Sequence, residues 1–291
     1  MNKLIEILNK IFNTKINSKA LRLIGISLVA LTVIAFWYEW YILTYDDSDY
    51  YEEEMWAEDC NVFGIELYND LETVVYLDED NSGADFDTLY ESTSSGIVDT
   101  IEWAEEDESV KAIIFSIDSV GGTPVAAEEV ANALKRASKP TVVLIREYGN
   151  SGAYYAATGA DMIFASLSSD VGGIGVSMSY VDYAKQNQKD GLTFNQIISG
   201  KFKDMGDPDK ILTAEEKALA MRDVKILHEI FIKAVAENRN LDIEKVRAIA
   251  DGSSMLGQMA LDNGLIDKIG DLNDAKQYLR EQIEEEVEIC W

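Results

Sequence analysis

A serine and two lysines have the types and surroundings that hydrolysis requires. Ser151 lies within Gly149–Ala157, where a strand-like run gives way to a helix of small and aromatic residues. Lys201 and Lys203 flank Phe202 in a short loop further along the chain. A serine hydroxyl is a weak nucleophile that needs a neighbouring base, and lysine can be that base. The pattern therefore suggests hydrolytic chemistry based on a serine and a lysine.

Histidine is an unfavourable base in this chain. His228 is the only histidine, and it falls in the middle of an expected helix, far from any glycine turn. A lysine can act near neutral pH only where burial lowers its pKa from ~10.4 towards ~7–8. Two structural alternatives stay open: Ser151 could be a helix N-cap, and the loop lysines could simply be solvated.

Two strand-like runs precede Ser151, at 110–117 and 141–145. The first of them is followed by a second glycine turn, Gly121-Gly122. Adjacent parallel strands bring such turns together at the carboxyl edge of a sheet, where sites form in α/β proteins. An oxyanion hole needs two fixed N–H donors beside the nucleophile. The backbone N–H groups of Gly122 and Gly152 are therefore the candidate donors.

Composition narrows the class of protein. The chain has 291 residues, a hydrophobic content of 47% and a formal net charge of −28, so it can bury a core and is unsuited to binding nucleic acid. Cys60 and Cys290 cannot form a four-ligand zinc site with one histidine. We expect neither metal nor cofactor. The two cysteines could form a disulfide outside the cytoplasm or remain free thiols, and the sequence leaves both open.

The N-terminal part has the pattern of a membrane anchor. Residues 23–38 carry no charge, and an aromatic cluster follows. Basic residues precede this run, whereas 46–59 contain eight acids and no base, so the N-terminus is expected in the cytoplasm and the rest outside. A cleaved signal peptide is the alternative. The expected segments are a cytoplasmic basic amphipathic segment (1–22), a transmembrane anchor (23–45), an acidic spacer (46–60) and a catalytic domain (61–291).

Strand–turn–helix units repeat along the catalytic domain and predict an α/β fold with a mostly parallel sheet. The C-terminal third is expected to be helical, and Thr213–Glu216 predicts a capping box. The expected strands are 62–67, 73–77, 110–117, 141–145, 162–165 and 194–198, and the expected helices are 95–107, 124–137, 154–159, 213–238, 243–250 and 275–286.

From about residue 62 to 270, the sequence resembles the signal peptide peptidase A (SppA) family of Ser–Lys peptidases in its short, single-domain bacterial form. Single motifs are weak, but their order and spacing together are specific. The matching segments are Ser116–Gly122, Ser151–Ala157, Ala160–Ala165, Gly172–Val176, Ser199–Asp204, Ala250–Ser254 and Gly264–Gly270.

The resemblance implies a role for each matching position. It makes Ser151 the nucleophile, Lys203 rather than Lys201 the general base, and Gly122 and Gly152 the oxyanion donors. It also implies a ClpP/crotonase-like fold of stacked αβ units, a ring-shaped homo-oligomer, and an endopeptidase acting on remnant signal peptides and possibly other membrane or secreted polypeptides.

Three positions depart from the family pattern. Val120 and Ala153 replace a usual proline and glycine, and Gly173 replaces a serine that is thought to orient the lysine. A water or Ser169 is the expected substitute. Two other functions remain open: a catalytically impaired scaffold or regulatory homologue, and a crotonase-type acyl-CoA enzyme.

Overall fold

The computed structural model describes residues 3, 6, 10, 31–38, 60–74, 90 and 92–291. The chain divides into two compact units, Met1–Glu58 and Asp59–Trp291. In the first unit, residues 31–38 form a helix with exposed side chains, while the rest of the predicted anchor and most of segments 1–22 and 46–60 lie outside the described residues. Over the part of the chain that is described, no helix combines the length and apolar character needed to cross a membrane.

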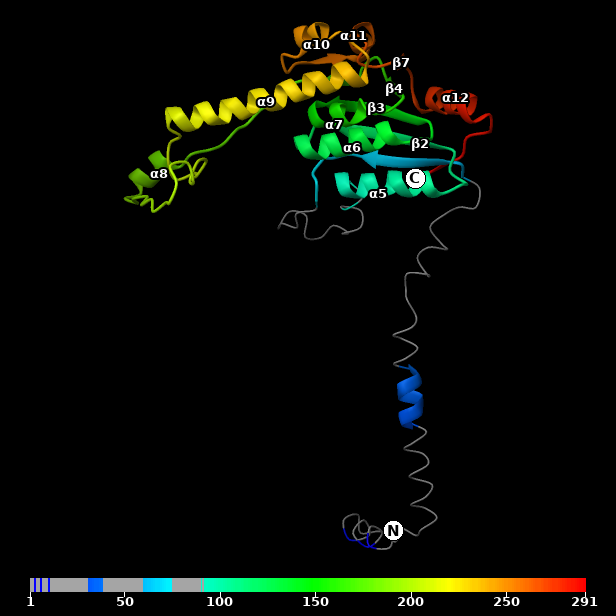
Figure 1. Cartoon of the computed structure of the whole chain (residues 1–291), viewed down its shortest axis with the longest axis horizontal. Helices are drawn as coiled ribbons and strands as arrows, with labels where there is room; N and C mark the ends of the chain where they lie inside the picture. The colour runs from blue at the N-terminus through cyan, green and yellow to red at the C-terminus, as the bar shows by residue number, and fades with distance from the viewer. Residues whose placement is uncertain are drawn as a thin grey trace. The chain divides into compact units, whose positions relative to one another are not determined.

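The second unit is built on a mostly parallel sheet, as predicted (Figure 1). Its strand order is β6-β5-β3-β2-β1-β8, and β4 pairs with β3 and β7. Among the strands that the structure describes, only the β5–β6 pair is antiparallel. The strands are β1 (Val62–Leu67), β2 (Ala112–Ser119), β3 (Thr141–Asn150), β4 (Met162–Ala165), β5 (Asp170–Gly172), β6 (Ser254–Leu256), β7 (Lys268–Ile269) and β8 (Ile289–Cys290).

Helices cover the sheet and extend beyond it. They are α5 (Ser94–Glu106), α6 (Pro124–Arg136), α7 (Ser151–Ala157), α8 (Ala184–Lys189), α9 (Ala214–Asn238), α10 (Ile243–Ile249), α11 (Gly257–Asn263) and α12 (Leu272–Ile283). Ala275 and Leu279 of α12 pack in one cluster with Ile114 of β2 and Leu144 of β3. Since successive side chains of a strand alternate between faces, Ile113 and Phe115, which are also fully buried, belong to the opposite face.

Strand β3 has two partners in succession, which extends it as far as Ser151. Its first part, Val142–Ile145, pairs with β4, and its last part, Tyr148–Asn150, pairs with β5. The second part was not predicted, because Arg146, Glu147 and Tyr148 are exposed and give no apolar signal. This extension carries the chain directly into α7 at Ser151.

Residues 177–213, here called the arm, connect the sheet region to α9. The strand predicted at 194–198 is wrong: this stretch is an irregular, exposed segment. A strand needs a partner for its backbone groups, and none pairs with it among the described residues. The capping box at Thr213 and Glu216 is confirmed at the start of α9. In the strand predicted at 73–77, residues 73 and 74 are bends and the remainder lies outside the described residues.

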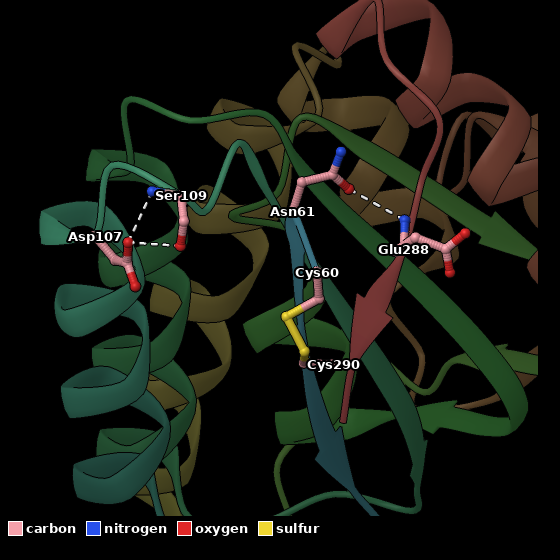
Figure 2. Close-up of a disulfide and its surroundings, with 6 residues drawn as sticks. All are labelled: Cys60, Asn61, Asp107, Ser109, Glu288 and Cys290. Carbon is pink, nitrogen blue, oxygen red and sulfur yellow. Dashed lines mark hydrogen bonds between the residues drawn. A yellow bond between two sulfur atoms is a disulfide. The ribbon is translucent and has the colours of Figure 1, made fainter. Parts of the chain in front are cut away.

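A disulfide joins Cys60 to Cys290, so the structure chooses one of the two states that the sequence left open (Figure 2). The two Cα atoms are 5.8 Å apart, and the parallel β1–β8 pairing begins beside them. The Asn61 side chain adds hydrogen bonds, donating to the Glu286 carbonyl at 2.8 Å and accepting from the Glu288 N–H at 3.1 Å. These contacts tie both ends of the second unit to one edge of the sheet.

Candidate active site

Ser151 is the first residue of α7 and follows β3 without an intervening loop. Its φ of +50° lies in the left-handed region, which residues other than glycine rarely adopt. The N-cap position belongs to Asn150, so the N-cap alternative for Ser151 is wrong. Such strain is stored where the surrounding structure enforces it, as is common at active sites. The sharp turn holds Ser151 at the carboxyl edge of β3.

The Gly121-Gly122 turn lies directly against Ser151. A Cβ atom added to Gly121 would be 3.1 Å from the Cβ of Ser151, and one added to Gly152 would be 3.0 Å from the Gly122 carbonyl oxygen. Gly152 is in the first turn of α7, where helix N–H groups lack intrahelical partners. The structure therefore brings together three of the four predicted site residues: Ser151, Gly122 and Gly152.

A short segment before the first helix of the sheet region fixes the Gly122 turn. The Leu71 N–H donates to the Gly121 carbonyl at 2.9 Å, and the Leu71 carbonyl accepts from the Thr123 N–H at 2.8 Å. The Ser119 hydroxyl donates to the Asn69 carbonyl at 2.6 Å. The backbone at Gly122 is thus held on both sides before any substrate arrives.

A cavity of about 170 Å³ opens beside Ser151. Its wall is mainly apolar, but the carboxylate-bearing Glu128 also lines it. Burial raises the pKa of Tyr155, another lining residue, to about 12, with the nearby charge of Glu128 adding to the shift. The Tyr155 phenol is therefore neutral and is no candidate base. The apolar and aromatic lining residues are Pro124, Val125, Tyr155, Val176, Leu227, Ile230 and Phe231.

Sequence reasoning missed this cavity wall, because its parts come from α6, α7, residues 175–177 and α9. Helical spacing alone could have placed Val125 and Glu128 on one face of α6. The α9 contribution depends on tertiary packing, which includes the stack of Phe231 on Tyr155 with ring centroids 5.1 Å apart. His228 lies within α9, as predicted, and is not among the lining residues.

Lys203, the fourth predicted site residue, lies in an exposed turn on the arm. Its N–H donates to the Gly200 carbonyl at 3.0 Å, and the adjacent Lys201 pairs with Glu215 at 2.5 Å, which ties the turn to the first residues of α9. Glu215 and Phe231, which lines the cavity, are sixteen positions apart along α9, or roughly 24 Å. Figure 1 accordingly shows α8 at the far end of α9 from α7. The single chain therefore does not bring Lys203 to Ser151.

The structure also describes Gly173, which replaces the family serine, and Ser169, its predicted substitute. Gly173 has a φ of +60°, and a Cβ there would be 3.3 Å from the Ser151 nitrogen. Ser169, the predicted substitute, is 1% exposed, and its hydroxyl donates to the Arg146 carbonyl and accepts from the Ser166 N–H. These bonds hold the Ser169 hydroxyl between β3 and its own turn, and its role as a lysine-orienting residue stays a prediction.

Comparison with known families gives the class of this site. The model for "Peptidase family S49" matches residues 133–286, just over half of the chain. The chain belongs to peptidase family S49. The matched range contains both Ser151 and Lys203, whereas Gly122 precedes it. This family assignment, together with the names of the relatives, supports a serine peptidase.

The similar curated proteins carry peptidase names. The chain is 35% identical over 186 residues to "Putative protease MJ0651" of Methanocaldococcus jannaschii, which covers 63% of this chain and 60% of the relative. It is 33% identical over 181 residues to "Putative signal peptide peptidase SppA" of Enterococcus faecium, covering 61% and 53%. A third relative, "Serine protease SPPA, chloroplastic" of Arabidopsis thaliana, is 29% identical, covering 62% and 27%. The chain thus spans less than two thirds of the length of these relatives.

Among solved structures, a ClpP1 variant from Listeria monocytogenes aligns with a TM-score of 0.44 and 12% identity, covering 72% of this chain and 92% of the other. This likeness is too low to carry an argument. The α/β class with a mainly parallel sheet is confirmed by the strand pairings themselves. The ClpP/crotonase-like stacking of αβ units stays a prediction from the family resemblance.

Proposed function

We propose that this S49 peptidase is a membrane-anchored serine endopeptidase in which Ser151 is the nucleophile and Lys203, from a neighbouring copy of the chain, is the base. One observation carries the proposal: Ser151, held in a left-handed conformation, faces a cavity and two glycine backbones that could serve as oxyanion donors. Three of the four groups needed for acyl transfer are therefore already preorganised in one chain.

The proposed reaction proceeds through an acyl-enzyme. As the Ser151 Oγ attacks the peptide carbonyl carbon, a neutral Lys203 amine takes the hydroxyl proton. The carbonyl oxygen becomes an oxyanion that accepts hydrogen bonds from the N–H groups of Gly122 and Gly152. Lysine then returns the proton to the leaving amine, the C–N bond breaks, and water, deprotonated by the same amine, releases the acyl group from Ser151.

The need for a second copy follows from the arm. Lys203 is too far from Ser151 in its own chain, yet the arm displays many apolar side chains that a monomer would leave in water. Exposed apolar side chains mark an interaction site where they gather into a patch, and this many on one 37-residue segment favours such a site. A ring of copies, each placing its arm beside the Ser151 of the next, satisfies both observations. The exposed apolar residues are Met178, Tyr180, Val181, Tyr183, Leu192, Phe194, Ile197, Ile198, Phe202, Met205 and Ile211.

Membrane anchoring and substrate class belong to the same proposal. Residues 23–45 would form the anchor, with the N-terminus in the cytoplasm and the catalytic domain outside the cell membrane. The Cys60–Cys290 disulfide supports this orientation, because such bonds persist in oxidising compartments. The proposed substrates are remnant signal peptides and other membrane or secreted polypeptides, in line with the name of the Enterococcus faecium relative. An apolar cavity beside Ser151 suits such segments.

Gly173 favours one competing function, a catalytically impaired scaffold. The family serine at this position would supply a hydroxyl to the lysine, and glycine supplies none. The backbone at Gly173 nevertheless keeps a left-handed φ beside Ser151, so the local fold is retained without that hydroxyl. Retention of Ser151, Lys203 and the glycine turns supports an active enzyme over a scaffold.

Covalent labelling tests the proposal most simply. The full chain in detergent is treated with a fluorophosphonate and, separately, with an apolar signal-peptide substrate. We expect labelling at Ser151 and cleavage of the peptide, with both lost in Ser151→Ala and retained in Ser168→Ala, an exposed serine outside the site. A crotonase-type enzyme or a scaffold would give neither labelling nor cleavage. The absence of both would overturn the proposed peptidase function.

A further inference from the structure

A cluster of three charged side chains lies immediately beside Lys203. The Lys210 Nζ is 2.9 Å from Oδ1 of Asp204 and 2.6 Å from Oε1 of Glu216. The three side chains are 18%, 8% and 3% exposed, respectively, although most of the surrounding arm is open to solvent. Burying charges costs free energy even when they are paired, so this cluster requires an explanation.

The cluster connects the lysine turn to a helix end. Glu216 is the N3 residue of the α9 capping box, and its Oε2 accepts from the Thr213 N–H at 2.8 Å and from the Thr213 hydroxyl at 3.0 Å. Asp204 directly follows Lys203 and also contacts the Gln196 side-chain amide. The Lys203 backbone is therefore one residue from a carboxylate that is fixed, through Lys210, to the rigid start of α9.

The hydrogen bonds within the cluster hold Glu216 and Lys210 in their charged forms at neutral pH. The hydrogen bond from Lys210, with further donors at Thr213, lowers the pKa of Glu216 to about 2. Hydrogen bonds to Glu216 and Asp204 and their charges raise the pKa of Lys210, despite the opposing effect of burial. A lysine held in its charged form cannot accept a proton, so Lys210 is excluded as the general base and is free to act as a structural link.

The neighbouring pair, Lys201 with Glu215, provides a natural comparison. It joins the same turn to the same end of α9, and its atoms are 2.5 Å apart, but both side chains are 64% exposed. Exposed ion pairs contribute little and hold their side chains loosely. If the arm only needed to stay attached to α9, the exposed pair and the buried cluster would serve equally; only the buried cluster fixes the residue adjacent to Lys203.

We propose that Asp204, Lys210 and Glu216 are positioning residues that fix the backbone of Lys203 relative to α9, so that its amine meets Ser151 of another copy at a reactive distance. This inference rests on the proposed function, because it assumes that Lys203 is the base. None of the three side chains touches substrate in the proposal. Misplacing a catalytic group by about 1 Å can cost about 100-fold in rate.

Steady-state kinetics of the full chain in detergent test this proposal. For Lys210→Met and the near-isosteric Asp204→Asn, we expect kcat to fall about 10- to 100-fold with KM changed less than about twofold. Labelling of Ser151 by the fluorophosphonate should slow in parallel, because it needs the same base. Lys210→Arg, which keeps the charge, should recover most of the rate, and the matched control Lys201→Met should behave as wild type.

The assembly state of each variant is measured alongside by sedimentation. Wild-type kcat in Lys210→Met and Asp204→Asn, while Lys203→Ala is inactive, would overturn the positioning role and leave the proposed base intact. Full activity of Lys203→Ala would instead contradict both the proposed function and this inference, because both require Lys203 as the base. If both cluster variants lose kcat only because they no longer assemble, the cluster is structural and the proposal is wrong.

Discussion

Ser151 differs in its backbone from the other serines that the structure describes, and the glycines around it make that backbone possible. The left-handed φ of Ser151 is enforced by a strand that enters a helix without a loop. Gly121, Gly122 and Gly173 all have positive φ. A Cβ atom added to Gly121 or Gly173 would meet Ser151, and one added to Gly122 would clash with Leu71. The residue types that matter most here are thus those without side chains.

Gly122→Ala is expected to disable the oxyanion hole. A Cβ at this position would lie 2.2 Å from the Leu71 carbonyl oxygen, so the turn must shift and carry its N–H away. Losing one oxyanion donor costs about 10²–10³-fold in kcat, with a smaller effect on KM. Peptide-cleavage kinetics measure this, with Val120→Ala, an exposed neighbour, as the control. A Gly122→Ala enzyme with wild-type kcat would show that this amide does not stabilise the oxyanion.

The backbone conformation of Gly173 explains a departure from the family motif that residue types alone leave unexplained. The family resemblance identifies a missing serine there, but it says nothing about the backbone. With φ at +60°, glycine is the residue that fits this position with least strain. The structure thus explains why glycine is tolerated, while Ser169, whose hydroxyl bonds Arg146 and Ser166, stays the predicted compensating group.

At the scale of the elements, β8 is, like β7, too short to form alone. It has only two residues, Ile289 and Cys290, and it pairs with the beginning of β1. The disulfide to Cys60 closes a chain separation of 230 residues at this point. Linking residues so far apart restricts the unfolded chain strongly, which stabilises the folded domain relative to it.

Replacing both cysteines by serine should lower the free energy of unfolding by about 2–4 kcal/mol. Urea denaturation of the catalytic domain measures the change, and a reducing agent should bring the wild type to the same midpoint while leaving the double variant unaffected. Cleavage without urea should be preserved, because Cys60 precedes β1 whereas Ser151 follows β3, at the opposite edge of a parallel sheet. Equal unfolding free energies for both proteins would contradict this account of β8.

Elements with their own apolar pattern were predictable, and elements that depend on distant partners were not. Strands β1 and β4 and helices α5, α6 and α9 follow their predicted ranges to within two residues. The short strands β5 and β6 were missed, since they exist only through pairing between segments far apart in sequence. Conversely, the apolar run 194–198 predicts a strand that does not form, and its side chains are exposed in the single chain.

The same distinction applies to the site. Ser151, Gly122 and Gly152 could be predicted together, because two glycine turns at adjacent parallel strands must meet at one edge of the sheet. The separation of Lys203 from Ser151 could not, because it depends on the length and direction of α9. No local pattern reports where a long exposed helix carries its far end.

At the scale of the whole molecule, the account requires that one copy completes the site of another. Within one chain, Ser151 lies beside the cavity at one part of α9, and the turn of Lys203 is tied to the other end through Asp204, Lys210 and Glu216. The arm, which carries Lys203, displays apolar side chains that assembly would cover. Assembly and activity should therefore be inseparable.

Mixing two inactive variants tests this claim most directly. Ser151→Ala retains Lys203, and Lys203→Ala retains Ser151, so each pure variant should be inactive. When equal amounts are dissociated and reassembled together, random neighbours in a head-to-tail ring should restore about a quarter of the wild-type activity. Mixing Ser151→Ala with the Ser151→Ala/Lys203→Ala double variant should restore none. A mixed assembly of the two single variants that remains inactive would contradict a dyad shared between copies.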